Sequence, residues 1–162
     1  MLDFTFSDSL LARLEAGEKA AVDFTVPLRA VADYMRTATV ERFEDERGPD
    51  GQPWKKSQRA ITDGGLTLTD RGHLRQSITA ASDARQAIAG TNLIYAAIHQ
   101  FGGTIRAKGA AGGGARALRT PFGPRGSVTI PARPFLGFGP VDVAEIEAML
   151  TDHLGTALGA GQ

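Results

Sequence analysis

The sequence predicts an α+β protein in which a small, mostly antiparallel sheet packs against a long N-terminal helix and a C-terminal helix. Apolar residues recur at helical spacing from about Thr25 to Glu46 and again after Asp142. Between these segments, short stretches alternate between apolar and polar residues, as half-buried strands do, and turn residues separate them. The 162 residues fit one domain, so a single domain is expected over residues 1–162.

The long helix expected from Thr25 to Glu46 has Pro27 in its first turn, where a missing N–H costs no hydrogen bond. Its apolar stripe consists of Leu28, Val31, Met35, Ala38 and Phe43. The acidic triplet Glu44–Glu46 closes the helix with the wrong sign for a C-terminus. We expect either Arg42 and Arg47 or a partner surface to neutralise it.

The C-terminal helix is expected to begin at Asp142 as its N-cap. Glu145 stands three residues later, which is the spacing of a capping box, and Val141 and Ile146 are spaced for a hydrophobic staple. The buried stripe is expected to consist of Ile146, Met149, Leu150, Leu154 and Leu158. A frayed end is expected over residues 159–162.

The other expected elements are short. The strands are Leu2–Phe6, Ser77–Ala81, Gln86–Gly90, Thr104–Lys108 and Ser127–Pro131, and the turn Ser82–Arg85 joins the second and third as a hairpin. Short helices are expected after Ser7, after Thr69 or Asp70, and over Tyr95–Phe101. Turn residues 48–53 lead to Trp54, which is either a hydrophobic plug under that loop or an anchor for a partner.

Two segments, residues 94–103 and 130–138, hold the densest apolar and aromatic sequence. The first has the spacing of one helix face and ends in two glycines, which suit a helix C-terminus. The second contains prolines, which indicate an edge strand running into an extended turn. We expect Phe101, Phe135 and Leu136 to be largely buried.

Between these segments lies a flexible insert, expected over about residues 108–126. From Ile105 to Arg133 there is no carboxylate, and the basic residues that could face a partner or DNA are Arg106, Lys108, Arg116, Arg119 and Arg125. Such a loop is either solvated or able to approach phosphate backbones. Phe122 is the only aromatic residue among them, which argues against sequence-specific recognition of nucleic acid.

Charge is segregated along a chain whose formal net charge is zero. Residues 1–50 carry 11 acidic and 6 basic side chains, residues 51–133 carry 3 and 12, and residues 134–162 carry 4 and none. This pattern indicates either surface solvation or an acidic face that meets a basic face, within the fold or between copies.

The residues give no sign of catalysis, a cofactor or a metal site. The chain has no cysteine, and none of its three histidines, His73, His99 and His153, has a metal-ligand residue three or four positions after it. There is no Gly-x-Ser-x-Gly elbow and no phosphate loop. No signal peptide is expected, and polar residues and glycines interrupt the uncharged stretch 86–105, which favours a buried core over a membrane span.

Five pieces, in order, resemble one family. They are Arg42-Phe43, Gly51–Lys55, Leu68–Ile78, Tyr95–Gly103 and Ile130–Gly137. Together they are similar to the phage virion morphogenesis family, the tail-completion proteins of Mu-like contractile-tailed phages and their prophages. The residues that match as structural motif are Trp54, Tyr95, His99, Gln100, Phe101, Gly102, Gly103, Pro131, Arg133, Pro134, Phe135 and Leu136.

The resemblance implies a non-enzymatic structural virion protein. It would form a homo-oligomeric ring of six copies at the head-proximal end of the tail, end tail growth and enable head–tail joining. Its expected partners are itself, the tail tube or sheath protein, a neck or head-completion protein, and non-specifically the DNA in the lumen. It would be assembled in the bacterial host cytoplasm and located in the virion tail or neck. The alternatives are a neck or head–tail connector component and a non-specific DNA-binding protein that uses the insert.

Overall fold

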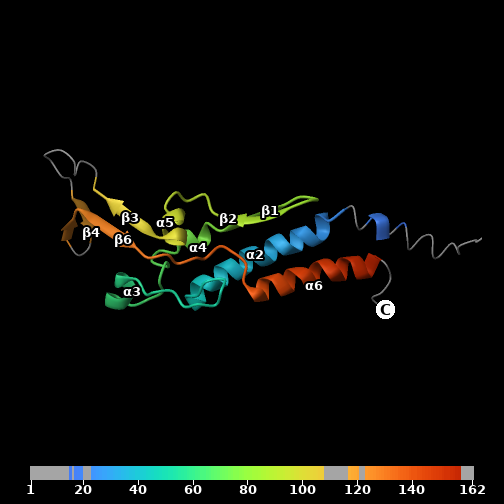
Figure 1. The fold of residues 1–162 in the computed structure, drawn as a ribbon, viewed down its shortest axis with the longest axis horizontal. Coiled ribbons are helices and arrows are strands. Elements are labelled where there is room, and N and C mark those ends of the chain that lie inside the picture. The colour runs from blue at the N-terminus through green and yellow to red at the C-terminus, as the bar shows by residue number, and fades with distance from the viewer. Residues whose placement is uncertain (1–14, 16, 20–22, 108–116, 121–122, 158–162) are drawn as a thin grey trace, which may run out of the picture. The chain divides into compact units, whose positions relative to one another are not determined.

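The structure is a computed structural model that describes residues 15, 17–19, 23–107, 117–120 and 123–157 (Figure 1). The chain divides into two compact units. The first comprises the residues up to Val40 together with Ile78–Gly90 and the chain from Phe138, and the second comprises Glu41–Ser77 and Thr91–Gly137. The α+β class is confirmed, with the described strands distributed over three two-stranded antiparallel sheets. That the units form one domain stays a prediction.

The first unit contains two long helices that run antiparallel. They are α2 (Thr25–Asp45), of which the part up to Val40 belongs to this unit, and α6 (Pro140–Ala157). The ring of Phe24, just before α2, lies 5.8 Å from that of His153 near the end of α6. The Tyr34 hydroxyl, further along α2, donates a hydrogen bond of 3.2 Å to Asp142 at the start of α6. The start of α2 thus lies beside the end of α6, and a later part of α2 lies beside the start of α6. The two helices are therefore antiparallel, as Figure 1 shows.

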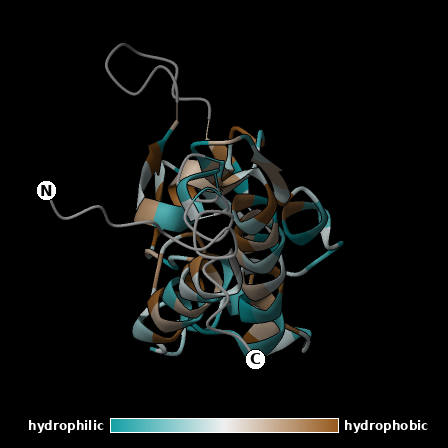
Figure 2. Cartoon of the chain, turned by 90° about the vertical axis from the view of Figure 1, so that its right-hand side faces the viewer, coloured by the Kyte–Doolittle hydropathy of each residue, from teal (hydrophilic) through white to brown (hydrophobic). Residues whose placement is uncertain are grey.

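The helices are amphipathic, as the sequence predicts. In α2, Val31 and Phe43 of the expected stripe are buried, and Leu28, Met35 and Ala38 are half-buried. The expected stripe of α6 is half-buried at its described positions, Ile146, Met149, Leu150 and Leu154. Hydrophilic residues interrupt the hydrophobic ones in each turn of these helices (Figure 2). Periodicity alone therefore identified both helices and the sides that they bury.

The start of α6 differs from the expectation. The helix begins at Pro140, so Gly139 is its N-cap and Asp142 is its third residue. The Asp142 carboxylate reaches back to accept a hydrogen bond of 2.6 Å from the Gly139 N–H, which is the second half of a capping box. Proline is favoured at the first helical position because its fixed φ suits the helix and its missing N–H has no partner there. The expected staple is also wrong, because Val141 is 72% exposed.

The first unit also contains the expected hairpin. Strands β1 (Thr79–Ser82) and β2 (Ala87–Gly90) pair antiparallel, with Thr79 opposite Gly90. In the turn, the Asp83 N–H donates to the Gln86 carbonyl at 2.9 Å. The Asp83 carboxylate accepts hydrogen bonds from the N–H groups of Arg85 and Gln86, and this hydrogen bonding lowers the pKa of Asp83. An aspartate that satisfies turn backbone in this way fixes where the hairpin folds back.

The second unit holds the short elements. These are α3 (Gln58–Thr62), α4 (His73–Gln76), α5 (Ala96–Phe101), β3 (Gly103–Arg106), β4 (Leu118–Thr120), β5 (Gly123–Arg125) and β6 (Ser127–Ile130). Strand β3 pairs antiparallel with β6, and β4 pairs antiparallel with β5. Helix α3 was not expected from the sequence. It begins after Ser57, whose hydroxyl accepts a hydrogen bond from the Ala60 N–H at 3.2 Å.

Two expectations for the second unit are wrong. Helix α4 begins after Gly72, which has a φ of 75°, and not after Thr69 or Asp70. The insert expected over residues 108–126 is not loop throughout, because β4 and β5 lie within it. Thr120 donates a side-chain hydrogen bond of 2.7 Å to the Gly123 carbonyl across this pair. Backbone pairing thus orders a segment whose composition suggested only loop.

Two basic residues that the sequence did not suggest pair with the acidic end of α2. Glu44 pairs with Arg75 at 2.8 Å, and Glu46 pairs with Lys56 at 3.4 Å. The Glu46 carboxylate also accepts a hydrogen bond of 2.7 Å from the Thr67 N–H, and hydrogen bonding from Thr67 lowers the pKa of Glu46. Arg42 and Arg47 donate hydrogen bonds to backbone carbonyls.

Several expectations lie outside the described residues. They are the strand Leu2–Phe6, the helix after Ser7, the role of Leu158 in α6, the basic residues Lys108 and Arg116, Phe122, and the frayed end at 159–162.

Candidate functional site

Three aromatic rings form the centre of the second unit. Phe43 and Phe135 are fully buried, and Trp54 is nearly so. The ring of Phe43 lies 5.2 Å from that of Phe135 and 5.6 Å from that of Trp54, with the second pair packed edge to face. Rings at these distances stabilise one another beyond the area that they bury. Trp54 is thus a hydrophobic plug, the first of its two expected roles.

Residues 133–137, here called the clamped segment, have irregular backbone that side chains satisfy. Arg42 donates to the carbonyls of Phe135 and Gly137 at 2.9 and 3.0 Å. The Trp54 indole N–H donates to the Pro134 carbonyl at 2.9 Å. The Gln100 side chain accepts hydrogen bonds from the N–H groups of Phe135 and Leu136, both at 3.0 Å, and donates to the Leu136 carbonyl at 2.8 Å. Buried backbone needs such partners, so these side chains hold the segment in place.

The glycines after α5 allow the backbone to approach this segment closely. Gly102 has a φ of 71°, and a Cβ atom there would lie 2.7 Å from the Ala132 nitrogen. Beside it, the Arg133 N–H donates to the His99 carbonyl at 2.7 Å. Gly103 has a φ of 147°, and its Cβ would lie 2.8 Å from the tip of Ile98. Glycine is thus needed at both positions, because each has a positive φ and a Cβ atom at each would approach a neighbouring atom too closely.

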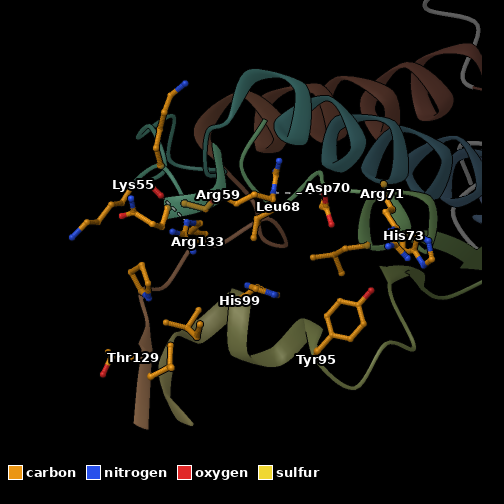
Figure 3. A pocket seen from close by; sticks show the side chains of 18 residues that line it. Lys55, Arg59, Leu68, Asp70, Arg71, His73, Tyr95, His99, Thr129 and Arg133 are labelled. Atoms are coloured by element: carbon orange, nitrogen blue, oxygen red, sulfur yellow. Dashed lines mark hydrogen bonds and ion pairs between the residues drawn. The ribbon is translucent and has the colours of Figure 1, made fainter. Parts of the chain in front are cut away.

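A pocket of about 950 Å³ opens in the second unit beside the clamped segment. Its walls come from α3, α4, α5 and β6, with the loops that lead into them. Five lining residues are basic, Lys55, Lys56, Arg59, Arg71 and Arg133, and one is acidic, Asp70. Figure 3 shows Lys55, Arg59 and Arg133 gathered at one end and Arg71 and His73 at the other, with His99 on α5 and Tyr95 just before α5 between them. We call this the basic pocket.

Only some of the pocket's basic residues form an ion pair with a carboxylate. Lys56 pairs with Glu46. Arg59 lies 3.8 Å from Asp70 and donates to the carbonyls of Gly64, Leu66 and Thr69. In the part of the chain that the structure describes, no carboxylate lies within ion-pair distance of Lys55, Arg71 or Arg133. The basic pocket therefore carries an uncompensated positive charge.

Arg133 is the most buried of these cations. Its residue is only 5% exposed, and its Nε donates to the Lys55 carbonyl at 2.7 Å. Burial lowers the pKa of Arg133, because removal from water disfavours the charged form. A guanidinium nevertheless stays protonated in proteins. This residue thus anchors the Lys55 loop and keeps a cation at the wall of the pocket.

His99 lies next to this cation, and its surroundings favour the neutral imidazole. Burial, with a smaller contribution from the charge of Arg133, lowers the pKa of His99. Its Nδ1 atom is buried without a hydrogen-bond partner in the described structure. Its ring meets the edge of Tyr95, with centroids 6.1 Å apart. His99 is therefore a structural histidine that lines the pocket, and its lowered pKa favours the uncharged form.

Apolar side chains on α5 and β3 are exposed, which corrects the expectation for Phe101. Phe101 is 78% exposed and Ile94 is 97% exposed, and Tyr95 and Ile105 are also exposed. Ala96 is buried and Gln100 faces the clamped segment, so the opposite face of α5 is the inward one. The clamped segment packs closely against this inward face of α5. The face has room for the small side chain of Ala96 and for Gln100, whose amide forms hydrogen bonds with the segment. Phe135 is buried as expected, and Leu136 is half-buried.

Comparison with known proteins shows what this chain is related to. The model of the phage virion morphogenesis family matches residues 4–155. The chain belongs to this family. It is 33% identical over 153 residues to the Mu-like prophage FluMu G protein 2 of Haemophilus influenzae, covering 94% of each chain. It is 29% identical over 146 residues to the putative capsid assembly protein G of Escherichia phage Mu, covering 84% of this chain and 82% of that one. No solved structure gives a significant match.

As a member of the phage virion morphogenesis family, the protein is a virion-associated structural protein of the Mu-like type, and the family is not an enzyme family. Among the described residues, no helix is long and apolar enough to span a membrane, and no three acidic or histidine side chains are grouped to hold a metal ion. The motif residues Trp54, Gln100, Gly102, Arg133 and Phe135 all serve to position the clamped segment.

Of the basic residues proposed from the insert, the three that the structure describes do not line the basic pocket. Arg106, Arg119 and Arg125 are exposed on β3, β4 and β5, away from its lining. The convergence of Lys55, Arg59 and Arg71 with Arg133 was not predicted from the sequence. The signal that could have found it is the excess of 12 basic over 3 acidic side chains in residues 51–133.

Proposed function

We propose that the protein forms a ring at the head-proximal end of the phage tail, where it ends tail growth and enables head–tail joining. Membership of the phage virion morphogenesis family supports a role in particle assembly. The observation that carries the proposal further is the exposure of Ile94 just before α5, Phe101 at the end of α5 and Ile105 on β3. Large apolar side chains grouped on a surface mark a site of contact with another protein.

Six copies would match the symmetry expected of a contractile tail. A ring arises when one surface of a subunit binds a different surface of the next and the rotation closes. The segregation of acidic and basic residues along the chain supports such a head-to-tail contact. The ring would contact the tail tube or sheath protein on one side and a neck or head-completion protein on the other, in the tail or neck of the virion.

A connector component on the head side of the joint is the second candidate. The name of the phage Mu relative, a putative capsid assembly protein, favours this position. Both candidates are structural roles at the head–tail joint, and they differ in which half of the particle carries the protein before the halves meet.

Deletion of the gene from its phage separates these roles. A ring that ends tail growth predicts tails of abnormal length and unjoined heads in electron micrographs of the lysate. A connector predicts tails of normal length that remain unjoined to heads. Cryo-electron microscopy of complete particles then locates the subunit, and a single copy off the tail axis would overturn the ring.

A further inference from the structure

The basic pocket is built to receive negative charge. Lys55, Arg71 and Arg133 line it without a carboxylate in the described part of the chain, and Arg133 is 5% exposed. A buried cation without a counter-charge is costly, and a carboxylate supplied from outside offsets that cost. We infer that this pocket is one half of the contact between neighbouring copies, and that it binds the acidic face of α6 from the next subunit. This inference rests on the proposed ring.

The walls of the pocket favour a protein over DNA. Apolar residues such as Leu68, Leu74 and Ile130 line it alongside the cations. The phosphates of a duplex lie on a rigid, wide cylinder and bind cations that project from a surface. A nearly buried cation such as Arg133, set in a partly apolar pocket, suits a carboxylate carried on a side chain with apolar neighbours.

The face of α6 has this chemistry. Val141, Glu145 and Asp152 are exposed and share one side of the helix, and Val143 and Glu147 are exposed on another side. Residues 134–162 contain four acidic and no basic side chains, so no cation of α6 competes for these carboxylates. Glu145 and Asp152 are seven residues apart and lie on one side of the helix, about 10 Å apart along its axis.

The two surfaces match in arrangement as well as in sign. The cations of the pocket lie at both of its ends, with Lys55 and Arg133 at one and Arg71 at the other (Figure 3). Carboxylates spaced along one side of a helix can meet both ends at once. Because pocket and helix face are different surfaces of the same chain, each copy can use both, and the contact repeats head to tail around a ring.

Photocrosslinking in assembled particles tests which molecule occupies the pocket. The complete phage is grown with a benzophenone amino acid in place of Arg71, an exposed position at the rim. After irradiation, mass spectrometry identifies the attached peptide. We expect a peptide from residues 140–157 of a second copy. The matched control places the same amino acid at Arg85, an exposed arginine in the β1–β2 turn, where this peptide is not expected.

The other crosslinking outcomes overturn the inference. Attachment to another virion protein assigns the pocket to that partner, attachment to DNA assigns it to nucleic acid, and no attachment at all shows that nothing is bound there. If the subunit still forms a ring on the tail axis in any of these cases, the proposed function stands and only this inference fails.

Charge reversal provides a second, independent measurement. The variant Lys55→Glu/Arg71→Glu should lower the yield of infectious particles by about tenfold or more, because like charges would then face each other at the contact. Adding Glu145→Lys/Asp152→Lys in the same chain should restore at least part of the yield. The control Arg36→Glu/Arg85→Glu makes the same change in net charge at exposed arginines outside the pocket. An equal loss in the control, or no rescue, would contradict the proposed contact.

Discussion

The side-chain amide of Gln100 binds both backbone groups of Leu136. Its Oε1 atom accepts a hydrogen bond from the Leu136 N–H at 3.0 Å, and its Nε2 atom donates to the Leu136 carbonyl at 2.8 Å. In effect Gln100 pairs with this residue as a neighbouring strand would. One polar side chain on a six-residue helix thereby fixes a segment that has no regular structure of its own.

Replacing Gln100 by leucine should destabilise the protein by about 1–3 kcal/mol, because the N–H groups of Phe135 and Leu136 lose their acceptor. Urea denaturation measures the change. The control Gln76→Leu alters an exposed glutamine in α4 and should cost far less. Equal costs at the two positions would show that the Gln100 hydrogen bonds contribute nothing to stability.

Replacing Gly102 by alanine should cost more than replacing Gly64 by alanine. Both glycines have a positive φ, 71° and 80°, so both substitutions carry a backbone strain of about 1–2 kcal/mol. Only at Gly102 does the added Cβ meet a neighbour, the Ala132 nitrogen at 2.7 Å, whereas nothing lies within 4 Å at Gly64. The difference between the two melting temperatures isolates the cost of the close contact. If the two variants melt together, the approach of α5 to the clamped segment is looser than described.

The stability of the protein should decrease as the pH is lowered, because His99 is harder to protonate in the folded state. Burial first, and then Arg133, lower the pKa of His99, so the unfolded chain takes up this proton at a higher pH than the folded one. The free energy of unfolding therefore has its full His99 contribution above the unfolded pKa of about 6.5 and loses it as the pH falls toward the lowered folded value. Urea midpoints taken from about pH 7.5 to pH 5 measure this slope.

In His99→Gln that part of the slope should disappear, because the side chain no longer titrates. In His73→Gln, which changes an exposed histidine, the slope should remain. A slope unchanged in His99→Gln would assign the pH dependence to other groups.

The long elements could be predicted from the sequence because their patterns extend over several turns. Helix α2 ends within one residue of the expected position, and the hairpin β1–β2 lies where alternation and turn residues place it. The start of α6 was misplaced because an aspartate can occupy either position of a capping box, the N-cap or the third helical residue. Asp142 reaches back to Gly139 from the third position, where the sequence alone suggested an N-cap.

The candidate site was harder to predict, since tertiary contacts decide it. Helix α5 is so short that its apolar spacing does not reveal which face is inward, and the polar Gln100 took that face instead of Phe101. The basic pocket needs Lys55, Arg71 and Arg133, which are far apart in the chain and converge only in the folded unit. Charge segregation predicted an excess of positive charge in this region but not its arrangement.

Phenylalanines 135 and 101 should separate folding from assembly. Phe135 is fully buried against Phe43, so Phe135→Ala should lower the free energy of unfolding by about 3–5 kcal/mol. Phe101 is 78% exposed, so Phe101→Ala should change stability by about 0.5 kcal/mol or less. If the exposed apolar side chains of α5 and β3 contact a partner, Phe101→Ala should still reduce incorporation of the subunit into particles. Thermal melts of the purified variants and quantitative mass spectrometry of purified particles give the two readouts. A Phe101→Ala variant with normal incorporation would remove this surface from the proposed assembly, and a strongly destabilised one would show that Phe101 belongs to the core after all.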